Sequence, residues 1–149
     1  MSKIAFVFPG QGSQYVGMCK AFYDQYPVAR QLFEEADDAL GFSLTKLCFE
    51  GPEAELRLTY NTQPAILTAS TICAEILKQH GAVADIAAGH SLGEYSALVN
   101  AGAMKFADAV RIVRQRGQFM QEAVPVGEGS MSAVMGLAND KIVELCQKV

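Results

Sequence analysis

Apolar and polar positions follow one another in blocks that predict short strands alternating with helices. Residues 3–8 and 83–88 are short apolar runs that end at glycine-containing turns, as buried strands do. The helical period of 3.6 residues predicts helices over residues 16–25, 28–40, 44–49, 53–58, 61–79, 91–100 and 106–123. Strands that alternate with helices indicate the α/β class, with a parallel sheet flanked by helices.

The last part of the chain follows a different pattern. After a glycine linker at 127–129, residues 131–137 read as a strand, and Asn139 is placed to cap a last helix over residues 140–148. A single strand and helix cannot cover both faces of that strand. We therefore divide the chain into an incomplete α/β core, residues 1–125, and the beginning of a second unit, residues 126–149.

Composition narrows the class of protein. The chain has 149 residues, of which 50% are hydrophobic, which suits one domain with a sizeable core. A net charge of −4 argues against nucleic-acid binding, and no apolar run approaches the roughly 20 residues of a membrane helix. Four cysteines without CxxC spacing and only two histidines argue against a metal site. We expect a cytoplasmic protein whose cysteines are buried free thiols.

A Gly-His-Ser-Leu-Gly pentapeptide at residues 89–93 lies between a predicted strand and a predicted helix. This is the nucleophile-elbow arrangement, in which Ser91 is the nucleophile and the backbone N–H of Leu92 stabilises an oxyanion. The alternative is structural, because Ser91 and Glu94 also fit the S-x-x-E capping box. Capping does not require glycine on both sides of the serine, so the pattern favours chemistry.

A second glycine-rich segment, Gly-Gln-Gly-Ser-Gln at residues 10–14, follows the first predicted strand. It is too short for a dinucleotide-binding fingerprint. In a parallel sheet, this loop lies at the same edge as Ser91. Gln11 is therefore a candidate second oxyanion donor, and an ordinary glycine turn is the alternative.

Arg116 is the unusual charge of the helix predicted over residues 106–123. On a helical wheel, Arg111 and Arg114 fall on the opposite, wet face. The residues within about 60° of Arg116 are all apolar: Ala109, Ile112, Val113, Phe119, Met120 and Ala123. A buried guanidinium needs an anion, which is either a carboxylate of the protein or a carboxylate of the substrate.

A general base for Ser91 is harder to find. His90 adjoins Ser91, and neighbouring side chains diverge in a sharp turn, so we interpret it as structural. His80 ends the helix that leads into the second predicted strand and so lies at the opposite edge of the sheet. Asp108 begins a helix and fits a solvated surface. The sequence therefore shows no complete catalytic triad.

Four motifs together resemble the malonyl-CoA:acyl carrier protein transacylase family of type II fatty acid synthases. They are Phe-Pro-Gly-Gln-Gly-Ser-Gln at 8–14, Thr-Gln-Pro-Ala at 62–65, Gly-His-Ser-Leu-Gly-Glu-Tyr at 89–95 and Arg-Gly at 116–117. The resemblance covers the whole chain and implies a cofactor-independent acyltransferase of fatty acid biosynthesis. Malonyl would pass from coenzyme A to a serine and then to the phosphopantetheine thiol of acyl carrier protein.

The same resemblance implies roles for individual residues. Ser91 is the nucleophile, with Gln11 and the Leu92 N–H as its oxyanion hole. Arg116 pairs with the free malonyl carboxylate, and Gln63 lies near the site. A leucine after the serine is typical of malonyl-selective members, and residues 126–149 resemble the first strand and helix of a ferredoxin-like subdomain.

One departure from the family bears on activity. Family members are considerably longer, and their catalytic histidine follows the ferredoxin-like subdomain. We therefore expect an N-terminal piece that lacks this histidine, either as a fragment or as one of two pieces. Two alternatives stay open: a serine hydrolase, such as a thioesterase or a patatin-like lipase, and an inactive fragment that only binds or folds.

Overall fold

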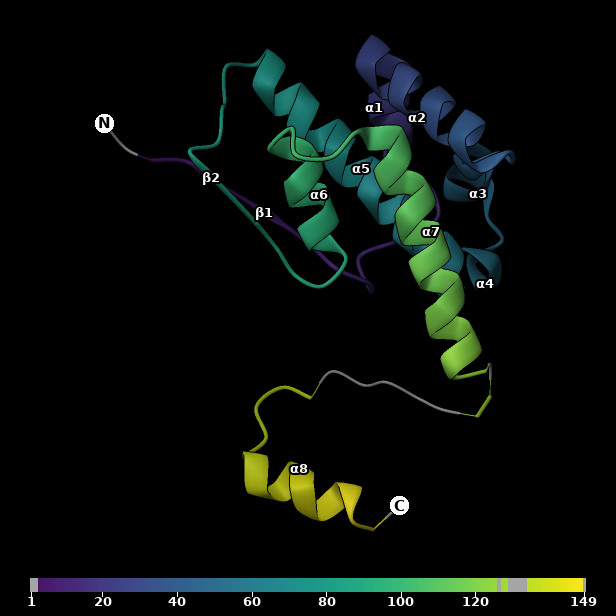
Figure 1. The fold of residues 1–149 in the computed structure, drawn as a ribbon, viewed down its shortest axis with the longest axis vertical. Helices are drawn as coiled ribbons and strands as arrows, with labels where there is room; N and C mark the ends of the chain where they lie inside the picture. The colour runs from purple at the N-terminus through teal and green to yellow at the C-terminus, as the bar shows by residue number, and fades with distance from the viewer. Residues whose placement is uncertain (1–2, 126, 129–133, 149) are drawn as a thin grey trace.

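The computed structural model describes residues 3–125, 127–128 and 134–148 (Figure 1). In chain order its elements are β1 (Ala5–Phe8), α1 (Lys20–Gln25), α2 (Pro27–Leu40), α3 (Leu44–Glu50), α4 (Glu53–Leu56), α5 (Thr59–Gln79), β2 (Ile86–Gly89), α6 (Gly93–Asn100), α7 (Phe106–Ala123) and α8 (Asn139–Cys146). No helix within these described ranges is long and apolar enough to cross a bilayer.

The two strands pair in parallel, with Ala5 opposite Ile86 and Phe8 opposite Gly89. Helices α1 to α5 form the long crossover that a parallel pair requires. The predicted α/β class with a parallel sheet is therefore confirmed. Because the carboxyl ends of both strands meet at one edge, the loop after β1 and the turn after β2 lie next to each other.

The strands are less buried than the sequence predicts. Phe6 and Phe8 pack in one cluster with Ala74 of α5. Val7 and Ile86 point to the opposite face of the sheet, where they are 76% and 64% exposed. The prediction of buried strands therefore holds for one face of the sheet and is wrong for the other, because the described helices cover only one face.

Helix α1 begins at Lys20 instead of residue 16. Gly17 and Cys19 have φ values of 93° and 61°, in the left-handed region that a right-handed helix cannot include. The segment that leads away from the first glycine-rich loop is therefore a series of turns, and Cys19 is the residue that precedes α1.

Helix α5 begins at Thr59, so Pro64 lies inside the helix and not in its first turn as predicted. Proline has no N–H to donate to the carbonyl of Tyr60. That carbonyl instead accepts a 3.4 Å hydrogen bond from Nη1 of Arg114, and the Asn61 side chain accepts a second bond from the same nitrogen at 2.8 Å.

Arg114 is thus half-buried between α7 and α5, and its predicted place on the wet face is wrong. Its guanidinium also stacks over the ring of Phe42, 4.4 Å from the ring centroid. Partial burial lowers the pKa of Arg114 below its ordinary value. The two helices can approach this closely because Gly117 has no side chain. A Cβ at that position would lie only 2.5 Å from the Cα of Tyr60.

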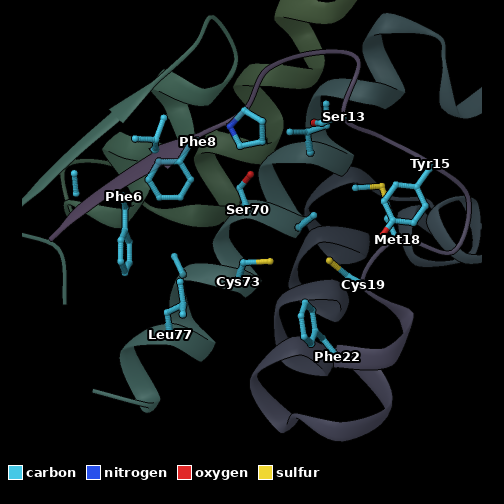
Figure 2. Close-up of a pocket in the computed structure, with 16 residues that line it drawn as sticks. Phe6, Phe8, Ser13, Tyr15, Met18, Cys19, Phe22, Ser70, Cys73 and Leu77 are labelled. Atoms are coloured by element: carbon cyan, nitrogen blue, oxygen red, sulfur yellow. The ribbon is translucent and has the colours of Figure 1, made fainter. Parts of the chain in front are cut away.

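A groove of about 460 Å³ lies between β1, the segment leading into α1, and α5 (Figure 2). Its lining is mostly apolar and includes the thiols of Cys19 and Cys73. Of the four free cysteines, only Cys48 is buried, Cys19 is half-buried, and Cys73 and Cys146 are exposed. The prediction that the thiols are buried is therefore wrong for Cys73 and Cys146, because these positions fall on open faces of their helices.

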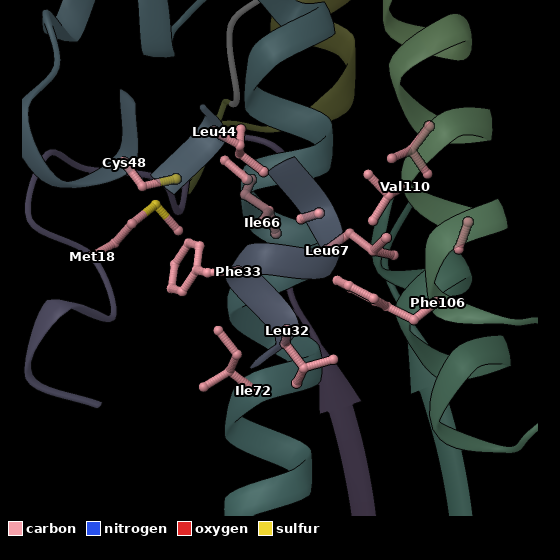
Figure 3. Close-up of a cluster of buried hydrophobic side chains, with 14 of the residues drawn as sticks. Met18, Leu32, Phe33, Leu44, Cys48, Ile66, Leu67, Ile72, Phe106 and Val110 are labelled. Atoms are coloured by element: carbon pink, nitrogen blue, oxygen red, sulfur yellow. The ribbon is translucent and has the colours of Figure 1, made fainter. Parts of the chain in front are cut away.

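The main hydrophobic core lies where α2, α5 and α7 pack together (Figure 3). Phe33, Leu67 and Val110 are fully buried there, one from each helix. Burial of a side chain of this size contributes roughly 1.5–3 kcal/mol. This core holds α5 beside α7, and those two helices carry Gln63 and Arg116.

The C-terminal part differs from its prediction in two ways. Residues 131–133 of the predicted strand lie outside the described residues, and residues 134–137 are not in a strand. Asn139 is the first residue of α8 and Ala138 is its N-cap, with no side-chain capping bond, so the predicted Asn139 cap is wrong. Helix α8 contains no buried residue, and its apolar Val143 and Leu145 are more than half exposed.

Candidate active site

Ser91 lies in the turn between β2, which ends at Gly89, and α6, which begins at Gly93. Its φ of 53° places it in the left-handed region, which is costly for a residue with a side chain. Such strain persists only where the surroundings enforce it. The strained turn leaves Ser91 exposed at the edge of the sheet, as in a nucleophile elbow.

The two flanking glycines enforce this turn. A Cβ at Gly89 would overlap the carbonyl group of Gly93, and a Cβ at Gly93 would overlap the carbonyl oxygen of Phe8. The turn is therefore packed directly against the end of β1, with no room for a methyl group on either side. The expectation that both positions require glycine is confirmed, because a side chain at either one would collide with the backbone.

The capping alternative for Ser91 is wrong. The N-cap of α6 is Leu92, and no side chain caps this helix. The Ser91 hydroxyl oxygen instead accepts a hydrogen bond from Nη2 of Arg116, at 3.1 Å. The side chain thus points toward α7 and away from the free N–H groups of its own helix.

Arg116 connects Ser91 to a buried polar group on α5. Its Nη1 donates to Oε1 of Gln63 at 2.8 Å, and the Gln63 side chain is fully buried. The Nε2 atom of Gln63 in turn donates to the sulfur of Met120, at 3.1 Å. The guanidinium also lies 5.7 Å from the ring centroid of Tyr95. The structure therefore brings Ser91, Arg116 and Gln63 together.

Met120 and Tyr95 were not singled out in the sequence. Met120 lies four positions after Arg116 on α7, whereas Ser91 lies in the turn before the helix that carries Tyr95. Side chains at that spacing lie on one face of a helix. The helical period was therefore the signal that could have identified Met120, and it gave none for Tyr95.

Arg116 does not lie at the centre of the buried face of α7, as the helical wheel predicted. The buried face of α7 consists of Phe106, Ala109, Val110, Val113 and Gly117. Ile112 and Phe119, which flank Arg116 on the wheel, are 41% and 59% exposed. Arg116 therefore lies half-buried at the edge of the packed face and not at its centre.

Within the described residues, Arg116 forms no ion pair with a carboxylate, so the structural ion pair offered as an alternative is wrong for this part of the chain. Its nearest partners are a neutral amide, a hydroxyl and an aromatic ring. A full positive charge thus stands beside Ser91 with hydrogen-bonding capacity left over, because a guanidinium has five N–H donors.

The first glycine-rich loop lies against the serine turn. A Cβ at Gly10 would lie 2.8 Å from the carbonyl oxygen of His90, and the His90 N–H donates to the Phe8 carbonyl at 3.1 Å. The exposed side chain of Gln11 donates to the Thr59 hydroxyl at 3.4 Å. The Leu92 N–H has no acceptor within the part of the chain that the structure describes. The oxyanion-hole role of Gln11 and the Leu92 N–H stays a prediction.

A base for Ser91 is not found among the described residues. His90 is exposed, with its ring against Gly10, and is not hydrogen-bonded to Ser91. His80 lies at the end of α5, where its ring contacts the hydroxyl of Tyr26 at 3.4 Å. Asp108 forms an exposed ion pair with Arg111. The only side chain hydrogen-bonded to the Ser91 hydroxyl in the described ranges is that of Arg116.

A strained serine between a parallel strand and a helix, with a cation at its hydroxyl, defines an α/β protein of the nucleophile-elbow class. More specifically, the chain belongs to the acyl transferase domain family, whose model matches residues 5–148. The resemblance inferred from the sequence motifs is confirmed at this level.

The curated relatives that the chain matches are acyltransferases by name. The chain is 56% identical, over 149 residues, to the malonyl CoA-acyl carrier protein transacylase of Bacillus subtilis strain 168, covering 100% of this chain and 47% of that protein. It is 53% identical to the enzyme of the same name from Escherichia coli O157:H7, covering 99% of this chain and 48% of that one. The chain thus spans about half the length of the curated relatives it matches.

Solved structures agree with this. An acyl-carrier-protein S-malonyltransferase from Burkholderia pseudomallei 1710b superimposes with a TM-score of 0.88 at 53% identity, covering 99% of this chain and 48% of that one. A malonyl-transacylase in complex with its type II polyketide synthase acyl carrier protein gives a TM-score of 0.90 at 48% identity, with the same coverage. This similarity locates the fold of the chain within the first half of such enzymes.

Proposed function

We propose that this chain is the N-terminal half of a malonyl-CoA:acyl carrier protein transacylase that acts in fatty acid biosynthesis. The malonyl group would pass from coenzyme A to Ser91 and then to the phosphopantetheine thiol of acyl carrier protein. The names of the relatives and the carrier-protein complex among the solved structures support the substrate and the partner. The proposed location is the cytoplasm, and no cofactor takes part.

The observation that carries the proposal is the hydrogen bond from Arg116 to Ser91, 3.1 Å long. A malonyl ester on the Ser91 hydroxyl would extend a free carboxylate only a few bonds beyond that oxygen. The guanidinium is close enough to bind this carboxylate through two parallel hydrogen bonds. A charge-assisted bond of this kind is worth about 1.5–3 kcal/mol, which corresponds to roughly 10- to 100-fold selectivity for an acyl group with a carboxylate.

Ser91 would act in two half-reactions. Its oxygen attacks the thioester carbonyl, its proton passes to a base, and the coenzyme A thiolate leaves after the tetrahedral intermediate collapses. The base gives the serine proton to the departing coenzyme A sulfur. It then takes the proton of the phosphopantetheine thiol as that sulfur attacks the seryl ester, and it returns this proton to the Ser91 oxygen as the ester bond breaks. Because Arg116 donates to the hydroxyl, the O–H of Ser91 stays free to donate its own proton to that base.

The oxyanion and the base complete the proposal. The Leu92 N–H, which has no acceptor among the described residues, and the Gln11 side chain would stabilise the negative oxygen of both intermediates. The family resemblance implies that the base is a histidine that follows the ferredoxin-like subdomain, in the half of the protein that this chain does not include. Neither His80 nor His90 is hydrogen-bonded to Ser91. Residues 1–125 would form the incomplete core, and residues 126–149 would begin the ferredoxin-like subdomain.

A chimera tests this proposal directly. The 149-residue chain is joined to the C-terminal half of the Bacillus subtilis relative, folding is checked by circular dichroism, and the protein is mixed with malonyl-CoA. Intact mass should show one malonyl adduct, which is lost on addition of carrier protein bearing phosphopantetheine. The Ser91→Ala chimera should acquire none, and Ser43→Ala, an exposed serine at the start of α3, should acquire it normally. A folded chimera without the adduct, or a labelled Ser91→Ala protein, would overturn the proposal.

The serine-hydrolase alternative shares the strained turn and the glycine loop. A thioesterase or patatin-like enzyme that acts on neutral acyl groups has no use for a cation beside the serine, and Arg116 therefore favours acyl transfer of a charged group. Steady turnover of a neutral ester by the chimera, with no acyl group passed to the carrier thiol, would favour the hydrolase instead.

The isolated chain is expected to be inactive, since the described residues supply no base. In this respect the isolated chain is expected to behave as the inactive-fragment alternative predicts. Full transacylase activity from the 149 residues alone would show that a base within the chain had been missed.

A further inference from the structure

Cys19 and Cys73 face each other across the groove beside β1. Cys19 precedes α1, and Cys73 lies on α5, so the two thiols come from segments far apart in the sequence. Figure 2 shows the sulfur atoms pointing toward one another within the lining of the groove. The pair lies among apolar side chains such as Phe22 and Leu77, and none of the residues proposed for acyl transfer line the groove.

A hydrogen-bonding contact between the two thiols shifts the pKa of each. It lowers the pKa of Cys73 to about 7 and raises the pKa of Cys19 well above its ordinary value. These opposite shifts make Cys73 the thiol of the pair that ionises more readily. Since the thiolate is the reactive form, and Cys73 is exposed, the nucleophile of the pair is Cys73.

We propose that Cys19 and Cys73 form a redox-active thiol pair, a modification site at which Cys73 attacks a small disulfide of the glutathione type and Cys19 completes an intramolecular disulfide. The proposal is independent of the acyl-transfer function, because it uses different residues and a different groove.

The exchange balances as two displacements. The Cys73 thiolate attacks one sulfur of the small disulfide, forms a mixed disulfide and releases one small thiolate. The Cys19 thiol then loses its proton and attacks the Cys73 sulfur, which forms the Cys19–Cys73 bond and releases the second small thiol. The protein is oxidised by two electrons, and one small disulfide is reduced to two thiols.

The left-handed backbone at Cys19 supports this pairing. Its φ of 61° is costly for a residue with a side chain, and the backbone there directs Cys19 toward α5. A disulfide would tie the segment that runs from the first glycine-rich loop into α1 onto α5. The other two cysteines serve as internal comparisons: Cys48 is fully buried, and Cys146 lies exposed on α8.

The test treats the 149-residue chain with oxidised glutathione at pH 7 and follows intact mass and peptide maps. The parent chain and Cys146→Ser should lose two hydrogens in forming the Cys19–Cys73 bond, with no glutathione retained on either residue. Cys19→Ser should instead keep one glutathione on Cys73, since the resolving thiol is gone. Cys73→Ser should form no intramolecular disulfide.

Two results would overturn the proposal. One is a parent chain that keeps glutathione on Cys73 as Cys19→Ser does, which would mean that the two sulfurs do not meet. The other is a Cys19–Cys73 bond that forms at the same rate in urea, which would mean that folding does not bring the pair together. Circular dichroism of each variant, recorded first, separates loss of pairing from loss of fold.

Discussion

The guanidinium of Arg116 donates a 3.1 Å hydrogen bond to the hydroxyl of Ser91, although the two residues are 25 positions apart in the sequence. Ser91 is fixed by the strained turn after β2, and Arg116 by the packing of α7 on α5. The distance between them therefore depends on two separate parts of the fold. Each part leads to a prediction that can be measured.

Replacement of Arg116 should change which acyl group is accepted. In the chimera, Arg116→Ala should lower kcat/KM for malonyl-CoA by about 100-fold and for acetyl-CoA by only a few-fold, because only malonyl carries the carboxylate. Arg116→Lys keeps the charge but not the two-pronged geometry, and it should fall between these values. Equal losses for both substrates would remove the carboxylate-binding role of Arg116.

Gln63 should control the availability of that charge. Gln63→Glu would place a carboxylate 2.8 Å from Arg116, where it would pair with the guanidinium and compete with the malonyl carboxylate. We expect kcat/KM for malonyl-CoA to fall at least about tenfold, with a smaller effect on acetyl-CoA. Gln115→Glu adds the same charge to the exposed side of α7 and serves as the control. A Gln63→Glu enzyme that discriminates as the parent does would contradict the pairing.

The close contact of the serine turn with β1 predicts a large effect from one methyl group. Gly93→Ala would drive a Cβ into the Phe8 carbonyl and should cost about 2–3 kcal/mol of stability, measured by urea unfolding of the chain. Leu98→Ala, on an exposed position of the same helix, should cost less than about 1 kcal/mol. A Gly93→Ala chain as stable as the parent would show that the turn moves freely.

These contacts also show how far the sequence leads. The elbow pattern at 89–93 predicted the turn and its glycines, because glycine is required where backbones touch. It did not decide between cap and nucleophile for Ser91, because that depends on where the side chain points. Likewise the helical wheel found Arg116 unusual but misplaced it, since a wheel treats every apolar residue as buried, and Phe119 is exposed.

The thiols illustrate the same limit. Composition predicted free cysteines, but the approach of Cys19 to Cys73 depends on how α1 and α5 pack, which no local pattern encodes. Similarly, Pro64 marked the helix start too late, because the carbonyl that proline leaves without a donor is satisfied by Arg114 from another helix. Both features are tertiary and lie beyond the reach of periodicity.

The hydrogen bond between the thiols predicts how alkylation depends on pH. The pKa of Cys73 is about 7, so iodoacetamide labelling of Cys73 should rise between pH 6 and 8 as the thiolate forms and then level off. Burial raises the pKa of Cys48 to about 12, so Cys48 should remain unlabelled throughout.

Cys19→Ala removes the thiol that contacts Cys73, and it should raise the pKa of Cys73 and slow labelling at pH 7 by about fivefold. Cys19→Ser keeps a donor and should largely preserve the rate; equal rates in all three chains would contradict the hydrogen bond.

Arg114 and Arg111 lie on one helix, carry the same charge and should differ sharply in their contribution to stability. Arg114 donates to Asn61 and to the Tyr60 carbonyl and stacks over Phe42, so Arg114→Ala should lower the free energy of unfolding by about 1–3 kcal/mol. Among the described residues Arg111 forms only an exposed pair, and Arg111→Ala should cost less than about 0.5 kcal/mol. Urea unfolding of the two variants in the same buffer measures the difference. Equal losses would mean that water can replace the guanidinium as the donor to the Tyr60 carbonyl without loss of stability. Arg114 would then contribute no more to stability than a surface charge.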